Sequence, residues 1–368
     1  MTEPSVLAER NGSAAYLVLN RPKSINALDH EMALAMAAKL AEWAADDAVE
    51  AVVLSGAGER GLCAGGDIVA IHRDASAISG AGGAGGDEAA QNSPSGRFWW
   101  DEYRLNADIA SYPKPYVALM DGIVMGGGVG ISAHANTRIV TDRTRLAMPE
   151  VGIGFVPDVG GTHLLSRVPD NLGTYAGLTA GSLSGADAIA LGLADHYVLA
   201  ESLDAFRTAI GTDGLRAALD RYATTPPESK IAAQREWISK VFAADTVAEI
   251  IEGARAVGTS EADKVADTIA AKSPTALAVT LRSLRAAAGD ESLRQTLVRE
   301  YRVSLRCLEH PDMAEGIRAQ VIDKDRNPAW AQAVSEADIE RFFAPLDNDL
   351  VFDDPVLDDR TADVVAGS

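Results

Sequence analysis

Glycines and two acidic residues carry the chemistry that this sequence offers. The stretch MGGGVG spans residues 125–130, and MPEVGIGFVPDVGG at 148–161 places Glu150 and Asp158 in apolar surroundings. Gly lets a backbone approach a ligand closely, and a helix N-terminus offers unpaired N–H groups with a partial positive charge. Such amides suit a developing oxyanion, so amides and carboxylates together indicate acyl chemistry.

Two loops supply the glycines. The apolar run within PYVALMDG at 115–122 predicts a buried strand, and VGISAHAN at 129–136 predicts the start of a helix. A second loop, GLCAGGDI at 61–68, follows the strand-like run AVVLSG at 51–56. A lone Gly triplet is also explained by a tight turn and close helix packing. Two amides from two loops, however, can converge on one oxygen, and losing one donor of such an oxyanion hole costs ~10²–10³ in rate.

The first two hundred residues alternate strands and helices. AAYLVLN at 14–20 and AVVLSG at 51–56 predict two strands separated by a helix over 30–45, and two more short strands are predicted within 137–150. In this alternation Asp67 and Ile68 start the helix that follows the second glycine loop. The rhythm is that of an α/β core.

Beyond about residue 200 the strand signals fade and helices dominate. SPT at 273–275 supplies a Ser cap and a Pro at the first helical position. The predicted helices cover 201–210, 228–242, 246–257, 261–271, 275–287 and 291–308. Two segments of biased composition interrupt the pattern: 76–96, rich in Gly, Ala and Ser, is expected to be a mobile insertion, and 347–368, with seven Asp and no Lys, a disordered acidic tail.

Four segments resemble, in order and spacing, the landmarks of the crotonase (enoyl-CoA hydratase/isomerase) superfamily. They are LNRPKSINALD at 19–29, the CAGGDI loop, GIVMGGGVG and MPEVGIGFVPDVGGTHLLSR. Within the superfamily the chain is most similar to the 3-hydroxyisobutyryl-CoA hydrolases. That similarity rests on GGDI in place of the hydratases' usual GADI, on PDVGG, on DEYRLN at 101–106 and on EGIRAQVIDKDRNPAW at 315–330.

The resemblance implies a fold and a division of the chain. Residues 1–200 are expected to form the crotonase (ClpP-like) ββα spiral core of an α/β protein, and 201–346 a helical C-terminal region that covers the active site and mediates subunit contacts. The acidic tail at 347–368 receives no function. In the family the region of the 76–96 insertion borders the active site, so the insertion is interpreted either as a lid or as a tolerated flexible segment.

The resemblance also carries roles to five positions. Gly66 and Gly127 are expected to supply the oxyanion amides, Glu150 of MPE and Asp158 of PDVGG the catalytic carboxyls, and Glu102 of the EY pair a substrate contact. The two glycines, Glu150 and Asp158 are expected to touch the substrate as well.

A departure from the family bears on the reaction. Hydratases carry a second catalytic Glu three residues after the middle Gly, where this chain has Gly130, so hydration by two glutamates is disfavoured. For a thioester, Glu150 either attacks the carbonyl to form a mixed anhydride or deprotonates a water that attacks. Asp158 either binds the substrate hydroxyl or handles the proton of the leaving group. Two close carboxyls in an apolar pocket are expected to have different pKa values.

Simpler interpretations exist for each acidic residue. Glu150 could be an exposed loop carboxylate, and Asp158 a helix N-cap before VGGTHLLSR. Glu102 could be an acidic residue in the first turn of a helix, compensating the helix dipole. Cys63, beside the oxyanion loop, is interpreted as small packing because no His is placed to activate it.

Composition excludes several classes of protein. The formal charge of −20, from 33 basic and 53 acidic residues, argues against nucleic-acid or anionic-membrane binding. The six His lack metal-ligand spacing, and Cys63 and Cys307 form no disulfide framework. Neither a phosphate loop nor a G-x-S-x-G elbow nor H-E-x-x-H occurs. No metal and no separate cofactor are therefore expected, CoA being part of the substrate. Candidate contacts for its phosphates are Arg21, Lys23, Arg60 and Arg73.

The sequence therefore predicts a hydrolase that cleaves a short branched 3-hydroxyacyl-CoA, with 3-hydroxyisobutyryl-CoA as the expected substrate and valine breakdown as the setting. The alternatives are an enoyl-CoA hydratase or isomerase that uses Glu150 alone, and a CoA-binding protein without catalysis, because one scaffold hosts many reactions. The N-terminus has neither a hydrophobic signal region nor an Arg-rich transit pattern, so a cytoplasmic location is predicted. A homo-oligomer is expected.

Overall fold

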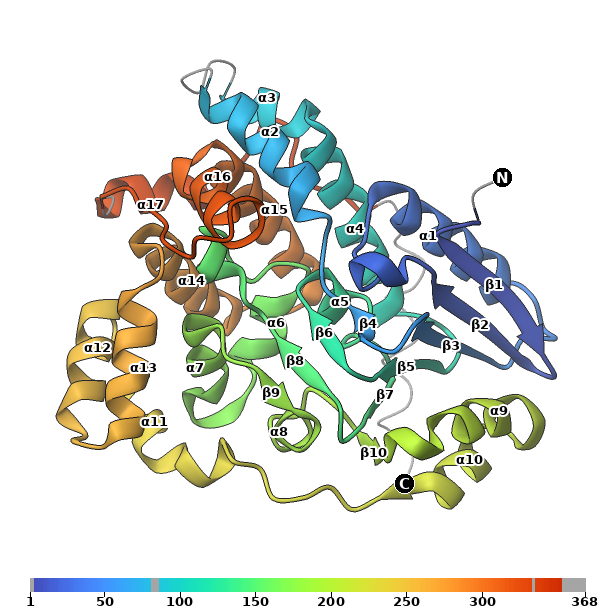
Figure 1. Ribbon diagram of the computed structural model, residues 1–368. Helices are drawn as coiled ribbons and strands as arrows, with labels where there is room; N and C mark the ends of the chain where they lie inside the picture. The colour runs from blue at the N-terminus through green and yellow to red at the C-terminus, as the bar shows by residue number, and fades with distance from the viewer. Residues whose placement is uncertain (1–2, 81–85, 333–334, 353–368) are drawn as a thin grey trace.

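Two β-sheets, with helices packed around them, organise the chain in a computed structural model that describes residues 3–80, 86–332 and 335–352 (Figure 1). The larger sheet has seven strands in the order β1-β2-β3-β5-β7-β10-β11. These strands are β1 (Val6–Asn11), β2 (Ala14–Leu19), β3 (Ala51–Gly56), β5 (Tyr116–Met120), β7 (Thr137–Val140), β10 (His196–Val198) and β11 (Ala223–Thr224). Its central pairs, from β2 to β10, are parallel, whereas the two edge pairs are antiparallel.

The smaller sheet has the order β4-β6-β8-β9, with β4 (Gly61–Cys63), β6 (Ile123–Met125) and β8 (Arg145–Ala147) parallel and β9 (Leu183–Ser184) antiparallel to β8. The chain places one strand in the larger sheet, the next in the smaller sheet, and then enters helical or turn structure. This happens at β3 and β4, again at β5 and β6, and again at β7 and β8. The α/β spiral of ββα units expected from the sequence is confirmed. One consequence is that β4, β6 and β8 deliver three successive loops to the same edge of the smaller sheet.

Strand and helix formation in the core follows from apolar patterning. β2 and β3 are buried almost throughout, as expected for parallel strands covered on both faces. Helix α1 (His30–Ala44) begins at Asp29, whose carboxylate accepts the amide N–H of Met32 at 3.0 Å. Its buried face carries Met32, Met36, Leu40 and Trp43, spaced by three and four residues.

Helices from distant parts of the chain enclose the loops of the smaller sheet. They include α2 (Ile68–Gly80), α3 (Gly86–Asn92) and α4 (Pro94–Ala110) from the first half, and α14 (Pro274–Ala287), α15 (Leu293–Glu309) and α16 (Pro311–Ile317) from the second. Figure 1 shows the two groups side by side above the strands, and α15 and α16 pack directly against α2. Helices from both halves of the chain therefore cover the loops that follow β4, β6 and β8.

The six helices predicted beyond residue 200 are confirmed, with shifted ends. They are α9 (Leu203–Asp213), α11 (Arg235–Val241), α12 (Val247–Ala256), α13 (Ser260–Ala270), α14 and α15. The prediction misses α10 (Leu215–Tyr222), α17 (Glu336–Phe343), α16 and the two-residue strand β11. The remaining short helices that matter below are α5 (Gly127–Gly130), α6 (Gly161–Ser166), α7 (Leu172–Thr179), α8 (Gly185–Ala190) and the 3-10 helix η2 (Glu150–Ile153).

The structure bears on three expectations of local structure. The start of a helix predicted at 129–136 is the single turn α5, which begins two residues earlier and is followed by further turns before β7 begins at Thr137. The described part of the 76–96 insertion is largely helical and belongs to α2, α3 and α4, while 81–85 lie outside the described residues, and its mobility stays a prediction. The tail predicted from 347 is placed as far as 352, where Arg302 holds Asp349 at 2.5 Å; residues 353–368 lie outside the described part.

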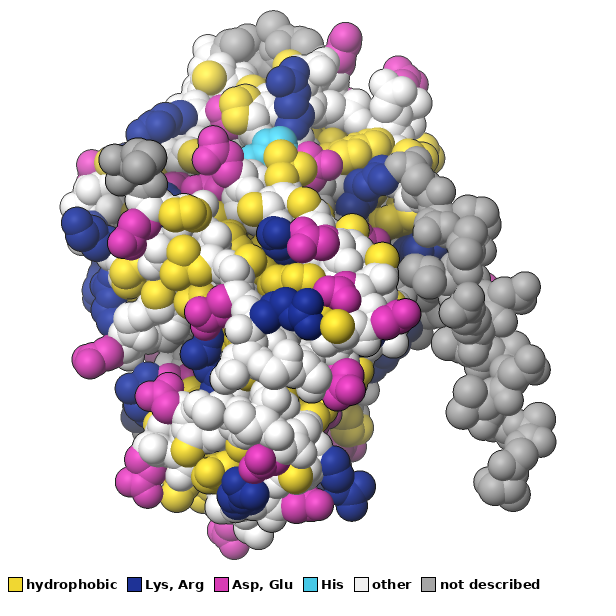
Figure 2. Space-filling model, turned by 90° about the vertical axis from the view of Figure 1, so that its right-hand side faces the viewer, with side chains coloured by type: hydrophobic (Ala, Val, Ile, Leu, Met, Phe, Trp, Pro, Cys, Tyr) yellow, Lys and Arg dark blue, Asp and Glu magenta, His cyan; other side chains and the backbone are white. Residues whose placement is uncertain are grey.

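The surface charge is intermixed rather than segregated. On the face that Figure 2 presents, basic and acidic side chains alternate with apolar ones. Ion pairs such as Arg138–Asp195 at 2.6 Å and Arg207–Glu9 at 2.7 Å engage many of the arginines. Much of the positive charge of this acidic chain is therefore paired with its own acidic side chains.

The cap of α14 provides a test of the packing between the C-terminal helices. Buried Ser273 accepts the N–H of Ala276 and donates to Asp312 at 2.5 Å, so it ties α14 to α16. We expect Ser273→Ala to lower the free energy of unfolding by ~1–3 kcal/mol, because a cap is lost and a buried carboxylate loses a donor. Urea denaturation measures this. The matched control is Ser292→Ala, which removes the exposed cap of α15 and should cost at most about 1 kcal/mol; equal losses would contradict the buried tie.

Candidate active site

The site is built where β4, β6 and β8 end. The loop after β4 is held by Leu28, whose N–H donates to Gly65 and whose carbonyl accepts from Asp67, both at 2.8 Å. These two bonds involve the residues on either side of Gly66, so the N–H of Gly66 itself is not bonded to Leu28. The turn after β6 places Gly126 at φ 48°, a conformation that Gly tolerates best, before α5 begins at Gly127.

The amides of Gly66 and Gly127 are close together and unbonded. Within the described residues, no acceptor bonds to either N–H. A Cβ placed on Gly127 would lie 3.5 Å from the nitrogen of Gly66, so both amides border one small volume. Two such donors from two loops can converge on one oxygen atom, which is what an oxyanion hole requires. The structure thus brings together the two glycines that the sequence singled out.

Glu150 is the first residue of η2, directly after β8. It is only 5% exposed, so it is not an exposed loop carboxylate. Its Oε2 atom has no hydrogen-bond partner among the described residues. A Cβ on Gly126 would lie 2.9 Å from Oε1, which places the carboxyl beside the Gly triplet. Burial and then the charge of Asp158 raise the pKa of Glu150 well above its ordinary value.

Asp158 faces the same volume and is held by a hydroxyl. It is 5% exposed, and the Tyr103 hydroxyl donates to its Oδ2 at 2.7 Å. Tyr103 in turn lies 2.7 Å from the hydroxyl of Ser304. Burial raises the pKa of Asp158 to about 7, while the bond from Tyr103 opposes the rise. Asp158 is not the N-cap of the next helix, because α6 begins after Gly160.

Glu102 lies in the middle of α4, eight residues after that helix begins. The interpretation as dipole compensation in a first turn is therefore wrong, because position 102 is more than two turns from the helix N-terminus. Its carboxyl is 2% exposed, and Oε1 has no partner among the described residues. A Cβ on Gly127 would lie 2.6 Å from that oxygen. Burial, followed by the charge of Asp158, raises the pKa of Glu102 well above its ordinary value.

All five predicted site residues line one cavity of about 130 Å³. Its walls are otherwise mostly apolar, and Trp99 and Phe155 stack with ring centroids 5.4 Å apart. The lining residues are Ala64, Gly65, Gly66, Ile68, Ile71, Phe98, Trp99, Glu102, Gly126, Gly127, Pro149, Glu150, Ile153, Phe155, Asp158 and Met313. Burial raises the pKa of each of the three carboxyls in this small apolar volume, and the charge of Asp158 raises those of Glu102 and Glu150 further.

The position of the hydratases' second glutamate is closed. A Cβ on Gly130 would lie 2.6 Å from the Cβ of Val159 and 2.9 Å from Nδ2 of Asn106. Both neighbours are fully or almost fully buried. A carboxylate side chain at position 130 would therefore need these two side chains to move.

Three other candidate residues, Cys63, Arg21 and Arg60, do not line this cavity. Cys63 is buried with its pKa raised to about 12 by burial, so it has little thiolate, in keeping with a packing role. Arg21 is engaged by Asp29 and Asp67, each at 3.1 Å, and Arg60 by the carbonyls of residues 22 and 23. These two arginines are thus committed within the chain. In the described ranges no group of three His, Cys, Asp or Glu could hold a metal ion, and no helix there is long and apolar enough to cross a membrane.

Sequence reasoning missed the residues that hold the acidic groups. Tyr103 and Ser304 fix Asp158, and Glu300, 1% exposed on α15, accepts three hydrogen bonds from the loop that follows Asp158. Tyr103 adjoins Glu102 in sequence, which was a usable signal. Glu300 and Ser304 are four residues apart on one helix face, but nothing in the sequence connects them to a loop about 140 residues earlier.

Comparison with known proteins identifies the family of this chain. Residues 14–343 match the model of the enoyl-CoA hydratase/isomerase family. The mitochondrial 3-hydroxyisobutyryl-CoA hydrolase of Danio rerio is 38% identical, covering 93% of this chain and 90% of that protein. That of Homo sapiens is 37% identical, covering 94% and 90%. The chain therefore belongs to the enoyl-CoA hydratase/isomerase, or crotonase, family, and it is an enzyme of that family.

Solved structures support the same fold. A crystal structure of a carnitinyl-CoA dehydratase from Mycobacterium thermoresistibile is 54% identical with a TM-score of 0.89, covering 95% of this chain and 99% of that one. An enoyl-CoA hydratase from Rhodobacter sphaeroides 2.4.1 is 37% identical with a TM-score of 0.85, covering 95% and 100%. The curated relatives are described as mitochondrial, and the cytoplasmic location and oligomeric state expected here stay predictions.

The raised pKa of Glu150 predicts a pH-dependent stability difference. A carboxyl whose pKa is raised by folding contributes stability that is fully present below its unfolded pKa, roughly 4.3, and lost as pH rises through the folded value. Glu150→Gln removes that loss. We expect the variant to gain stability relative to the parent between pH 5 and pH 8 in urea denaturation. Exposed Glu252→Gln is the control and should show no such gain; a relative loss for Glu150→Gln on going to pH 8 would contradict the burial argument.

Proposed function

We propose that this enzyme hydrolyses the thioester of a short branched 3-hydroxyacyl-CoA, with 3-hydroxyisobutyryl-CoA as the substrate and 3-hydroxyisobutyrate and CoA as the products, as in valine breakdown. The observation that carries the proposal is the convergence of Glu150, Asp158 and Glu102 on the free amides of Gly66 and Gly127 in one cavity. The names of the curated relatives support the same reaction.

The two amides polarise the thioester carbonyl in this mechanism. A thioester carbonyl oxygen between Gly66 and Gly127 accepts two N–H bonds, which strengthen as the oxygen gains charge. Removal of one such donor typically costs ~10²–10³ in rate. Because the amides belong to two loops held by separate strands, they are positioned before the substrate arrives.

Glu150 supplies the basic half. The Glu150 carboxyl lies beside the Gly triplet through Oε1, and its Oε2 has no partner among the described residues. Glu150 therefore either attacks the carbonyl carbon, forming an anhydride that water then cleaves, or removes a proton from an attacking water. In both routes one water is consumed, the carbon–sulfur bond breaks, and the departing sulfur takes a proton. Its raised pKa makes Glu150 a stronger base once ionised.

The other two carboxyls suit the substrate hydroxyl and the leaving group. Asp158, with its pKa near 7 and a fixed partner in Tyr103, exchanges protons close to neutral pH. Glu102, protonated more readily because it is buried, can donate a hydrogen bond to a substrate oxygen or accept one from a hydroxyl. A cavity of about 130 Å³ favours a short acyl group.

Hydration or dehydration of an enoyl-CoA is the competing function. It is favoured by the 54% identity to a structure described as a carnitinyl-CoA dehydratase. The crowding at Gly130 disfavours a second glutamate there, so such a reaction would use Glu150 with Asp158 or Glu102. A binder without catalysis is the third possibility, and the retained carboxyls disfavour it.

Thiol release from 3-hydroxyisobutyryl-CoA, followed beside loss of enoyl absorbance from crotonyl-CoA, separates these functions. We expect thiol release by the parent protein, a loss of about 10²-fold or more in Glu150→Gln because its base or nucleophile is gone, and no change of crotonyl-CoA. Glu309→Gln, a half-buried carboxyl on α15 that does not line the cavity, is the control and should keep its rate.

Other outcomes of this assay assign the protein elsewhere. Absorbance loss without thiol would move it to the hydratases, and thiol release that survives in Glu150→Gln would remove Glu150 from the mechanism. Binding of both thioesters without turnover of either would support the non-catalytic alternative.

A further inference from the structure

The turn that carries Asp158 is strained. Val159 has φ 54° and Gly160 φ 77°, so two successive residues adopt the left-handed conformation. That conformation is a genuine outlier for a β-branched residue and costs of order 1–3 kcal/mol. Strain of this size persists only where neighbouring groups hold the backbone in place. One such group is His134, whose Nε2 lies 2.8 Å from the carbonyl oxygen of Val159.

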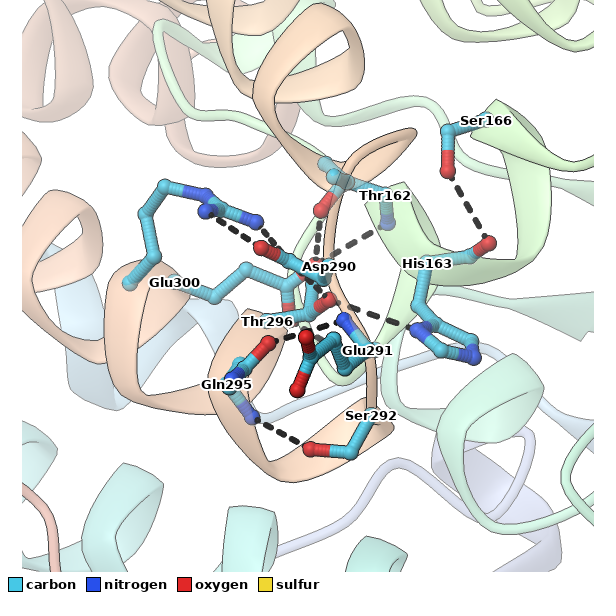
Figure 3. A network of polar contacts seen from close by, with 12 residues as sticks. Thr162, His163, Ser166, Asp290, Glu291, Ser292, Gln295, Thr296 and Glu300 are labelled. Carbon is cyan, nitrogen blue, oxygen red and sulfur yellow. Dashed lines mark hydrogen bonds and ion pairs between the residues drawn. The ribbon is translucent and has the colours of Figure 1, made fainter.

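Glu300 holds the other side of the turn. Its Oε2 accepts the N–H of Gly160 at 2.6 Å. Its Oε1 accepts the N–H and the hydroxyl of Thr162 at 2.9 and 2.5 Å (Figure 3). The carboxyl is 1% exposed and no basic side chain is bonded to it among the described residues. Burial raises the pKa of Glu300 to about 8, while the bonds from Thr162 and Gly160 oppose the rise, so the polar partners of this buried carboxyl come from the turn itself.

Glu300 fills the helix-capping role that was the simpler interpretation of Asp158. The first amides of a helix are commonly capped by the side chain just before it. Here α6 is preceded by Gly160, which has no side chain, and the cap comes from α15. Asp158 is thereby free to turn into the cavity, where Tyr103 binds it.

The same helix reaches Asp158 a second time. Ser304, one turn after Glu300, lies 2.7 Å from the Tyr103 hydroxyl that donates to Asp158. Further along the helix in the other direction, Thr296 contacts the ring of His163 on α6 at 3.3 Å and donates to Asp290 at 2.6 Å (Figure 3). α15 is therefore attached to the segment from Asp158 to His163 at several points.

We infer that Glu300 is a positioning residue: its carboxyl group holds the strained turn at 159–162 and so sets the direction of the Asp158 carboxyl in the cavity. This inference rests on the proposed function for its kinetic consequence, although the hold on the turn does not depend on which reaction occurs.

Glu300→Gln is the first test, because an amide N–H₂ of Gln would face a backbone N–H of the turn. We expect kcat for thiol release from 3-hydroxyisobutyryl-CoA to fall by ~10–100-fold with KM within about threefold, since a displacement of 1 Å can cost ~10² in rate. In hydrogen exchange, the amides of 158–163 should exchange faster than in the parent, with 247–256 on the remote α12 as an unchanged reference.

Two substitutions of Thr162 keep the inference testable if Glu300→Gln folds poorly. Thr162→Val removes one donor to Glu300 and should lower kcat in the same direction, whereas Thr162→Ser keeps the hydroxyl and should stay within about twofold of the parent. Their melting temperatures are measured too, because a purely structural role would change kcat only through the folded fraction.

The outcomes separate this inference from the proposed function. A kcat within twofold of the parent in Glu300→Gln, or equal losses in the two Thr162 variants, would overturn the positioning role. If the parent releases no thiol, the proposed function fails, and faster exchange at 158–163 in Glu300→Gln would still support the hold on the turn. Unchanged exchange in that segment would overturn it.

Discussion

Burial of carboxyl groups without basic partners is the constraint on which the rest of this structure depends. Glu102, Glu150 and Asp158 share an apolar cavity in which ionisation is costly for each of them. A chain that merely folded would replace them with apolar side chains. Their retention requires that strands, loops and helices from both halves of the chain hold them in place, and it makes proton occupancy a property of the three groups together.

In this architecture one set of elements positions the functional groups and another set holds them in place. The smaller sheet delivers the amides and Glu150 at the ends of three parallel strands, so their relative positions follow from the hydrogen bonds of the sheet. Helix α4 brings Glu102 and Tyr103, and α15 supports the turn after Asp158. The C-terminal helices are thus more than a cover, because one of them contributes buried polar contacts to the site.

Much of the core and the main site residues could be predicted from the sequence, and the reasons for the failures are physical. Apolar runs that end in glycines located the two loops, because strand ends and turn residues are local signals, and the family resemblance then pointed to Gly66 and Gly127 within them. The first-turn interpretation of Glu102 failed because the low-complexity segment before it gave no sign of where the helix begins, whereas α4 already begins at Pro94. Glu300 was invisible because a contact across about 140 residues leaves no trace in local pattern, and a distant cap is not distinguishable from a surface acid.

The closed position at Gly130 has a consequence for how reactions are exchanged on this scaffold. Val159 and Asn106 occupy the space that a side chain there would need, and Val159 is part of the strained turn beside Asp158. A glutamate at position 130 would therefore require the side chains of Val159 and Asn106 to move or to be replaced. Since Val159 lies in the turn beside Asp158, gaining a second glutamate on this scaffold is not a change confined to one residue.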